Sequence, residues 1–141
     1  MPTADPISVG ALTMTFHVDA EQSDGSVTVF EVDVPVGARV PAPHSHDAFE
    51  ETIFGLRGMT RWTVDGRDVP VGPGESVCIR RGVVHGFLND SPEAATFLAI
   101  ASPGVFGPEY FRELGAAIAS EDGGPGAIAA VMRRHGLTPA V

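Results

Sequence analysis

Short runs of apolar and β-branched residues, separated by glycine, proline and aspartate, fill the chain from about residue 12 to about residue 101. Segment 12–18 alternates apolar and polar residues, as a half-buried strand does, and segment 27–34 is rich in β-branched residues. Asp65-Gly66 lies between two such runs and is typical of a tight hairpin. Because 17 glycines and 12 prolines supply the turns, the pattern predicts about eight or nine strands in a closed or sandwich-like all-β fold. The predicted strands are 12–18, 27–34, 52–56, 60–64, 69–71, 76–79, 83–88 and 95–100.

The last quarter of the chain has a different pattern. Phe111, Leu114 and Ile118 recur at helical spacing, and a second short helix is predicted over about residues 125–135. We expect this helical tail, about residues 108–136, to pack on the outside of the barrel or against a second subunit rather than to carry function. The length fits one domain that covers residues 1–141.

Composition narrows the classes of partner. The net charge is -9 and all nine basic residues are arginines, so we expect no nucleic-acid partner and no Schiff base on a lysine. A single cysteine permits no internal disulfide, which favours a reducing compartment. There is no apolar stretch of about 20 residues for a membrane span, and the first ten residues lack a signal-peptide pattern. The sequence therefore predicts a cytoplasmic protein with no membrane partner.

Three of the five histidines lie in two short segments. His44 and His46 are separated by one residue, so an extended strand places both imidazoles on one face. Glu50 and Glu51 follow closely, and His85 comes after a glycine turn. Imidazoles with one carboxylate suit Fe, Mn, Ni, Co, Cu or Zn, whereas Ca and Mg prefer oxygen ligands. The candidate cofactor is one divalent transition metal.

These two segments resemble the two conserved motifs of the cupin family. The first family motif is Gly-x5-His-x-His-x3–4-Glu-x6-Gly, and the second is Gly-x5-Pro-x-Gly-x2-His-x3-Asn. This chain reads Gly37-ARVPAP-His44-Ser45-His46-DAFE-Glu51-TIFGLR-Gly58 and Gly74-ESVCI-Arg80-Arg81-Gly82-VV-His85-GFL-Asn89. The first gap is one residue longer than in the family, and Arg80 replaces the proline. All four metal-ligand positions are filled.

The resemblance implies a fold, a ligand set and an assembly. The fold is a double-stranded β-helix (cupin/jelly-roll) barrel over about residues 12–101, followed by the helical tail. The implied metal ligands are His44, His46, Glu51 and His85. Glu51 is preferred over Glu50 because it keeps the six-residue spacing to Gly58. This spacing runs along a strand, whereas an added residue between His46 and the glutamate is easily accommodated in a turn. Small cupins often pair as homodimers, so we expect one here, built on residues 1–18.

The resemblance also implies an activity. We expect a metal-dependent dioxygenase that acts on a small phenolic or enolisable molecule, with Glu51 as the general base, as in flavonol-cleaving dioxygenases. The alternatives are a non-redox isomerase or polyketide-type cyclase, and a cupin that binds a small ligand without turnover. Dimethylsulfoniopropionate lyases of this fold use a tyrosine at the metal. This class of enzyme is disfavoured because the single tyrosine, Tyr110, lies in the helical tail.

Five further side chains are expected to be structural. Isolated histidines such as His17 and His135 are usually structural. Cys78 lies in an apolar strand and is expected to be a buried small hydrophobe. Trp62 and Phe54 are expected in the barrel core.

Overall fold

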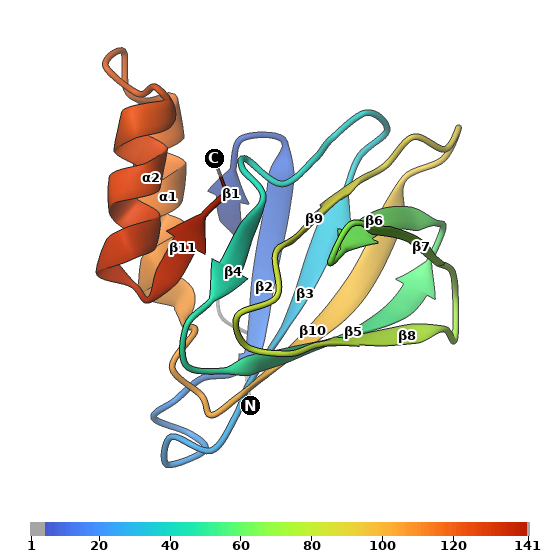
Figure 1. Cartoon of the computed structure of the whole chain (residues 1–141), viewed down its shortest axis with the longest axis horizontal. Helices are drawn as coiled ribbons and strands as arrows, with labels where there is room; N and C mark the ends of the chain where they lie inside the picture. The colour runs from blue at the N-terminus through green and yellow to red at the C-terminus, as the bar shows by residue number, and fades with distance from the viewer. Residues whose placement is uncertain (1–4, 141) are drawn as a thin grey trace.

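The structure is a computed structural model that describes residues 5–140. Two antiparallel sheets lie against each other, and two helices lie to one side of them, next to β1 and β11 (Figure 1). The six-stranded sheet has the order β1-β2-β3-β10-β5-β8, and the five-stranded sheet has the order β11-β4-β9-β6-β7. The elements are β1 (Ile7–Val9), β2 (Leu12–Val18), β3 (Thr28–Val34), β4 (His44–His46), β5 (Glu50–Arg57), β6 (Thr60–Val64), β7 (Arg67–Val71), β8 (Ser76–Ile79), β9 (His85–Leu88), β10 (Ala95–Ser102), α1 (Pro108–Ala119), α2 (Pro125–Arg134) and β11 (Leu137–Pro139). This two-sheet jelly-roll architecture confirms the predicted fold class.

The core lies between the two sheets. Every second residue of β3 is buried, which is the period-2 pattern expected for a strand with one face on the core. Phe30 from β3 stacks on Phe16 from β2 with ring centroids 4.7 Å apart. Trp62 is buried as predicted, and its indole N–H donates to Thr60 Oγ1 at 2.9 Å. The Trp62 ring also contacts Phe97 of β10 with centroids 5.1 Å apart, so aromatic side chains join the two sheets.

Two residues predicted to be buried lie on the outside. Phe54 is 39% exposed and Cys78 is exposed. Both follow from the parity of β5: Ile53 and Glu51 point inward, so Phe54 points outward. Cys78 pairs with Thr52, which belongs to the same outward set. The prediction was wrong because it relied on the apolar character of these two residues and not on the alternating direction of side chains along the strand.

The tail forms the two predicted helices, but its last strand and its packing differ from the prediction. β11 was not predicted, and it pairs with β4, placing Leu137 opposite His46. α1 packs against β1 so closely that a Cβ on Gly115 would lie 2.3 Å from Ser8 O. Neither helix in the described part of the chain is long and apolar enough to cross a membrane. Of the segment expected to build a homodimer, residues 1–4 lie outside the described residues.

Candidate metal centre

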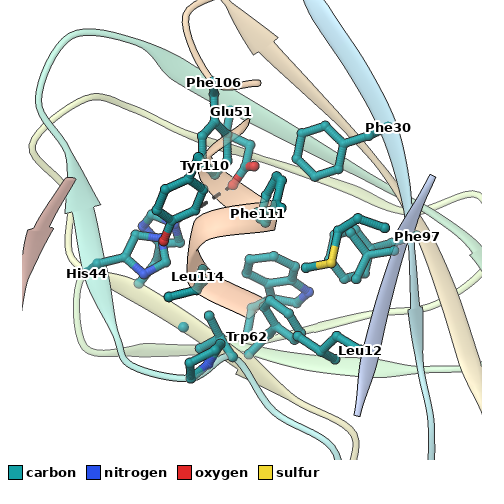
Figure 2. Close-up of a pocket in the computed structure, with 17 residues that line it drawn as sticks. Leu12, Phe30, His44, Glu51, Trp62, Phe97, Phe106, Tyr110, Phe111 and Leu114 are labelled. Carbon is teal, nitrogen blue, oxygen red and sulfur yellow. Dashed lines mark ion pairs between the residues drawn. The ribbon is translucent and has the colours of Figure 1, made fainter. Parts of the chain in front are cut away.

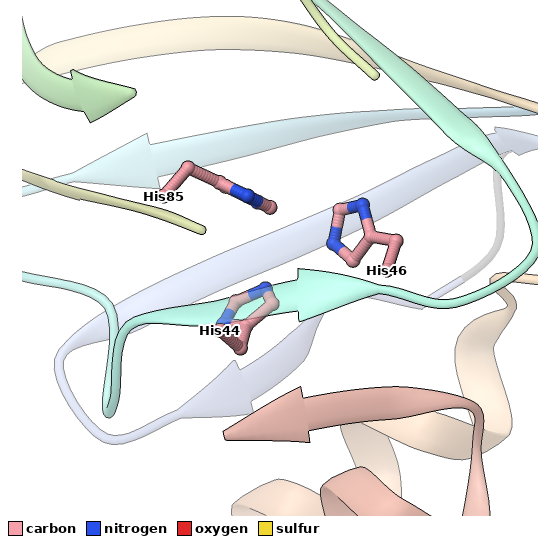
Figure 3. A group of neighbouring side chains, drawn as sticks. All are labelled: His44, His46 and His85. Carbon is pink, nitrogen blue, oxygen red and sulfur yellow. The ribbon is translucent and has the colours of Figure 1, made fainter. Parts of the chain in front are cut away.

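Neighbouring strands bring the three histidines together. His44 and His46 come from β4, and His85 is the first residue of β9 and the cross-strand partner of His44. The Gly82 N–H donates to His46 O at 2.8 Å, so the turn before β9 is fixed to β4. One ring nitrogen from each histidine lies within 4.8 Å of the others, and Figure 3 shows the three rings around one space. The two motifs therefore meet.

Backbone carbonyls determine which nitrogen of two rings carries the proton. His44 Nδ1 lies 2.8 Å from Ala42 O, and His85 Nδ1 lies 3.0 Å from Val83 O. A carbonyl oxygen only accepts a hydrogen bond, so each Nδ1 must donate. In both neutral rings the lone pair is therefore on Nε2. This is the arrangement found in metal-binding histidines, in which the second ring nitrogen is held by an outer hydrogen bond.

His46 has no hydrogen-bond partner in the described part of the chain, although it is 0% exposed. Its ring stacks on Phe49 with centroids 4.3 Å apart, which fixes the ring plane but satisfies neither nitrogen. A buried polar atom without a partner is costly. A metal ion bound by His46 would satisfy one of its two nitrogens.

The two candidate glutamates point to opposite sides of β5. Glu51 is 6% exposed, and its Oε1 lies 3.8 Å from His85 Nε2 (dashed in Figure 2). Glu50 instead accepts two hydrogen bonds from the Arg81 guanidinium, at 2.6 and 2.8 Å, and one from the Arg81 backbone N–H at 3.1 Å. Glu51 is therefore the carboxylate that faces the histidines.

Burial controls the charge of the whole cluster. Desolvation, helped by the charge of the neighbouring imidazoles, lowers the pKa of His44 to about 3 and that of His46 to about 2. Desolvation also lowers the pKa of His85 and raises the pKa of Glu51 to about 8. At neutral pH the imidazoles are therefore uncharged and can offer a nitrogen lone pair to a metal, and Glu51 has no cationic group beside it among the described residues. A divalent cation would reverse the preference of Glu51 by favouring its carboxylate.

The site opens into a small cavity with apolar walls (Figure 2). The cavity has a volume of about 40 Å³. One water molecule needs about 10–15 Å³, so the cavity has space for only a few. His44, Glu51 and His85 lie on one side. Aromatic and aliphatic side chains form the rest of the wall, and these are Leu12, Met14, Phe30, Val32, Val40, Pro41, Trp62, Phe87, Phe97, Phe106, Tyr110, Phe111 and Leu114. No arginine lines the cavity in the described chain.

The helical tail forms part of this wall, which corrects the prediction that it only packs outside. Tyr110, Phe111 and Leu114 are the buried residues of α1, and all three line the cavity. Tyr110 therefore shares the cavity with His44 and Glu51. Enzymes that use a tyrosine at the metal were disfavoured because Tyr110 lies in the tail. That reason does not hold, because Tyr110 lines the cavity. Sequence reasoning missed Tyr110 because the approach of α1 is set by packing between distant segments.

The donor set fits a divalent transition metal. Two imidazoles present Nε2 lone pairs, a third has unpartnered nitrogens, and a buried carboxylate lacks a cationic partner. Nitrogen donors with one carboxylate match Fe, Mn, Co, Ni, Cu or Zn better than Ca or Mg. The expected class of metal is therefore consistent with the arrangement of the donors.

Comparison with known proteins identifies the family. The sequence profile of the cupin domain matches residues 30–101, which is half of the chain and includes both histidine segments. The chain belongs to the cupin family. Its cupin domain places the candidate metal centre between β4, β5 and β9, all within the matched residues.

The chain is similar to individual cupins that carry different names. The chain is 33% identical over 96 residues to quercetin 2,3-dioxygenase of Bacillus subtilis (strain 168), and the match covers 67% of this chain and 27% of that protein. The chain thus spans about a quarter of that relative. A predicted oxalate decarboxylase from Thermotoga maritima superposes with a TM-score of 0.65 at 23% identity, covering 70% of this chain and 90% of the other. KdgF from Halomonas sp. gives a TM-score of 0.63 at 17% identity, covering 71% and 86%. These two structures support the fold alone.

Proposed function

We propose that this cupin is a metal-dependent enzyme, specifically a dioxygenase acting on a small phenolic or enolisable organic molecule. The observation that carries the proposal is the cluster of three neutral imidazoles and one inward carboxylate beside an aromatic cavity. The similarity to a quercetin 2,3-dioxygenase supports the same reaction class. It is partial support, because the match covers 27% of that protein.

Four residues would hold the ion: His44, His46, Glu51 and His85. The candidates are Fe, Mn, Ni, Co, Cu and Zn. When bound, such an ion supplies a Lewis acid for an enolate or phenolate oxygen. Neutral imidazoles suit this role because their lone pairs are free at neutral pH, as the lowered pKa values of His44 and His46 require.

Glu51 is the group proposed to take the proton from the substrate hydroxyl. Its carboxyl faces the cavity, and burial alone raises its pKa to about 8. This raised pKa belongs to the metal-free site; a bound cation would favour the carboxylate form of Glu51, which is the form that accepts a proton from a substrate hydroxyl. Glu50 cannot replace it, because the Arg81 guanidinium holds Glu50 on the outer side of β5.

The wall of the cavity favours an uncharged aromatic substrate. It offers many aromatic faces and, within the described residues, no arginine, and the chain has no lysine. For a small dianion such as oxalate, the bound ion would be the positive group available, because no cationic side chain lines the described cavity. The cavity is also small, so a substrate of more than a few heavy atoms requires some of the apolar lining side chains to move aside.

A non-redox isomerase or polyketide-type cyclase is the second candidate. It is favoured by one observation: Glu51 and Tyr110 both line the cavity, and two groups that carry protons can serve a reaction that needs no oxidant. In that enzyme the metal would act only on the substrate oxygen. A binding protein without turnover would need neither group to exchange a proton.

The test is oxygen consumption by iron-loaded protein with a panel of flavonols and simple phenols. We expect substrate-dependent uptake by the wild type and by the control variant Glu50→Gln, and loss of at least about 100-fold in Glu51→Gln, the lower end for a general base. Product formation without oxygen uptake would support the isomerase or cyclase instead. Binding without any product would contradict both enzymes.

The assembly stays a prediction. We propose a homodimer with no nucleic-acid partner, and sedimentation equilibrium on the full chain tests the homodimer. A molecular mass near 14.7 kDa, that of one chain, would contradict it.

A further inference from the structure

Tyr110 is packed among aromatic rings at the wall of the cavity. It lies on the buried face of α1 and is 3% exposed. Its ring contacts Phe106 and Phe111 with centroids 5.1 and 5.0 Å away, and it packs against His135 at 5.4 Å. His135 itself pairs with Glu113 of α1, so α1 and the end of α2 support the ring together. The position of the hydroxyl is therefore defined by three neighbours.

The hydroxyl of Tyr110 makes no hydrogen bond to another residue among residues 5–140, and it is not one of the fully buried polar atoms left without a partner, so its oxygen borders open space. Figure 2 shows the phenol extending from α1 toward the side of the cavity where His44 lies. The hydroxyl therefore faces the space that a ligand of the candidate metal centre would fill.

With a metal bound and Glu51 ionised, the Tyr110 hydroxyl is also the side-chain donor that stays free in the described cavity wall. The Trp62 N–H is already committed to Thr60 Oγ1. The Nδ1 protons of His44 and His85 are used by backbone carbonyls. Burial and the nearby Glu51 carboxyl raise the pKa of Tyr110 above its usual value, so the phenol keeps its proton at neutral pH.

We propose that Tyr110 is the residue that fixes the substrate, by donating a hydrogen bond to an acceptor oxygen of the molecule bound beside the metal. This inference rests on the proposed function. It assigns a specificity rule: the substrate must present an oxygen acceptor within reach of both the metal and α1. It also makes α1 part of the active site, since none of the barrel side chains that line the described cavity supplies this donor.

The first test measures the affinity of a small oxygen ligand. Formate is titrated into cobalt-loaded protein and followed by visible absorption. We expect Tyr110→Phe to keep its cobalt and to bind formate about 5- to 10-fold more weakly, as expected for one lost hydrogen bond. Arg112→Lys is the control, because it changes an exposed residue of α1 that does not line the cavity and keeps the charge. Its formate affinity should stay within about 2-fold of the wild type, a difference well below that of one hydrogen bond.

The second readout does not depend on affinity. Because Tyr110 is the one tyrosine of the chain, tyrosine labelled with ¹³C at the phenolic carbon gives one assigned NMR signal. In zinc-loaded protein we expect this signal to move when formate is added, and to saturate at the formate concentration that saturates the site. A signal that does not move would overturn the inference.

The outcomes separate the two proposals. Equal formate affinity in the wild type and Tyr110→Phe, with metal bound to both, overturns the role of Tyr110 alone. Loss of the metal from Tyr110→Phe also overturns it, because the hydroxyl would then be a ligand rather than a donor. A wild-type protein that binds neither cobalt nor zinc overturns the proposed function and this inference together.

Discussion

Single residues fix the turn geometry on which the site depends. Gly58 ends the first cupin motif with φ of +66°, and a Cβ there would lie 2.5 Å from Ala94 O. A left-handed backbone costs a residue with a side chain about 1–2 kcal/mol. At Gly58 this cost is joined by a backbone clash that no rotamer can relieve. The motif glycine is therefore required both for its conformation and for its lack of a side chain.

We predict that Gly58→Ala destabilises the protein more than Gly66→Ala does. Gly66 also has a positive φ, +76°, but a Cβ added there would have nothing within 4 Å of it. Urea unfolding should show a loss of about 1–2 kcal/mol for Gly66→Ala and a loss larger by at least about 1 kcal/mol for Gly58→Ala. Equal losses at the two positions would mean that the close approach to Ala94 does not matter.

For single residues, the sequence correctly predicted that the three histidines come together and that Trp62 is buried. It did not predict the direction of every strand side chain. Motif spacing identified the residues that meet around one space, because two short strands and their turns fix them locally. Phe54 and Cys78 were misplaced, although the inward direction of Glu51 would have set the parity of β5 and, through pairing, that of β8. An alternation count from Glu51 is the signal that could have corrected them.

Among the elements, β11 supports the strand that carries His44 and His46. It pairs with β4 along its whole length, so His44 and His46 lie in an inner strand rather than at the edge of the sheet. The sequence did not predict β11, because Gly136 and the nearby proline indicate only where the preceding helix ends. Long-range pairing of a three-residue strand has no local sequence signal.

We predict that Leu137→Ala loosens β4. Leu137 is buried and lies opposite His46, so its truncation should cost about 2–5 kcal/mol. Hydrogen exchange of the β4 amides should speed up by a corresponding factor, as measured by NMR. Val36→Ala, at a position 58% exposed, is the control and should change stability by less than about 0.5 kcal/mol. Unchanged β4 exchange in Leu137→Ala would show that β11 does not support the site.

The place of α1 could be predicted only in part. Helical spacing identified the helix and its apolar residues, and the same spacing puts Tyr110 next to Phe111 and Leu114 on one face. What spacing cannot give is the surface that this face covers. That surface is set by the packing of α1 on β1, which depends on segments about 100 residues apart in sequence.

For the molecule as a whole, the buried cluster makes the stability of the metal-free protein depend on pH in two directions. His44 and His46 have pKa values lowered from 6.5 to about 3 and about 2, so the unfolded chain binds more protons below pH 6.5. Their contribution is present above pH 6.5 and is lost as the pH falls. Glu51 has its pKa raised from 4.5 to about 8, so its contribution is present below pH 4.5 and is lost as the pH rises toward 8.

We therefore predict that the metal-free protein is most stable near pH 6.5. Thermal unfolding should show a lower midpoint on the acid side, because histidines must be protonated, and on the alkaline side, because Glu51 must be ionised in a buried place. Glu51→Gln should remove the alkaline decline and keep the acid one. A bound divalent metal should also remove the alkaline decline, because it favours the carboxylate, and should raise the midpoint. An alkaline decline that persists in Glu51→Gln would contradict the assignment.

Four side chains, those of His44, His46, Glu51 and His85, are proposed to hold one metal ion. The measurement is the metal content per chain, by mass spectrometry, of protein purified without added metal. We predict about one transition-metal ion per chain in the wild type and in the control His17→Ala, whose ring pairs with Glu31 at the surface. We predict little or no metal in His46→Ala and a reduced content in Glu51→Ala. Full metal content in both site variants, or none in the wild type, would contradict the account.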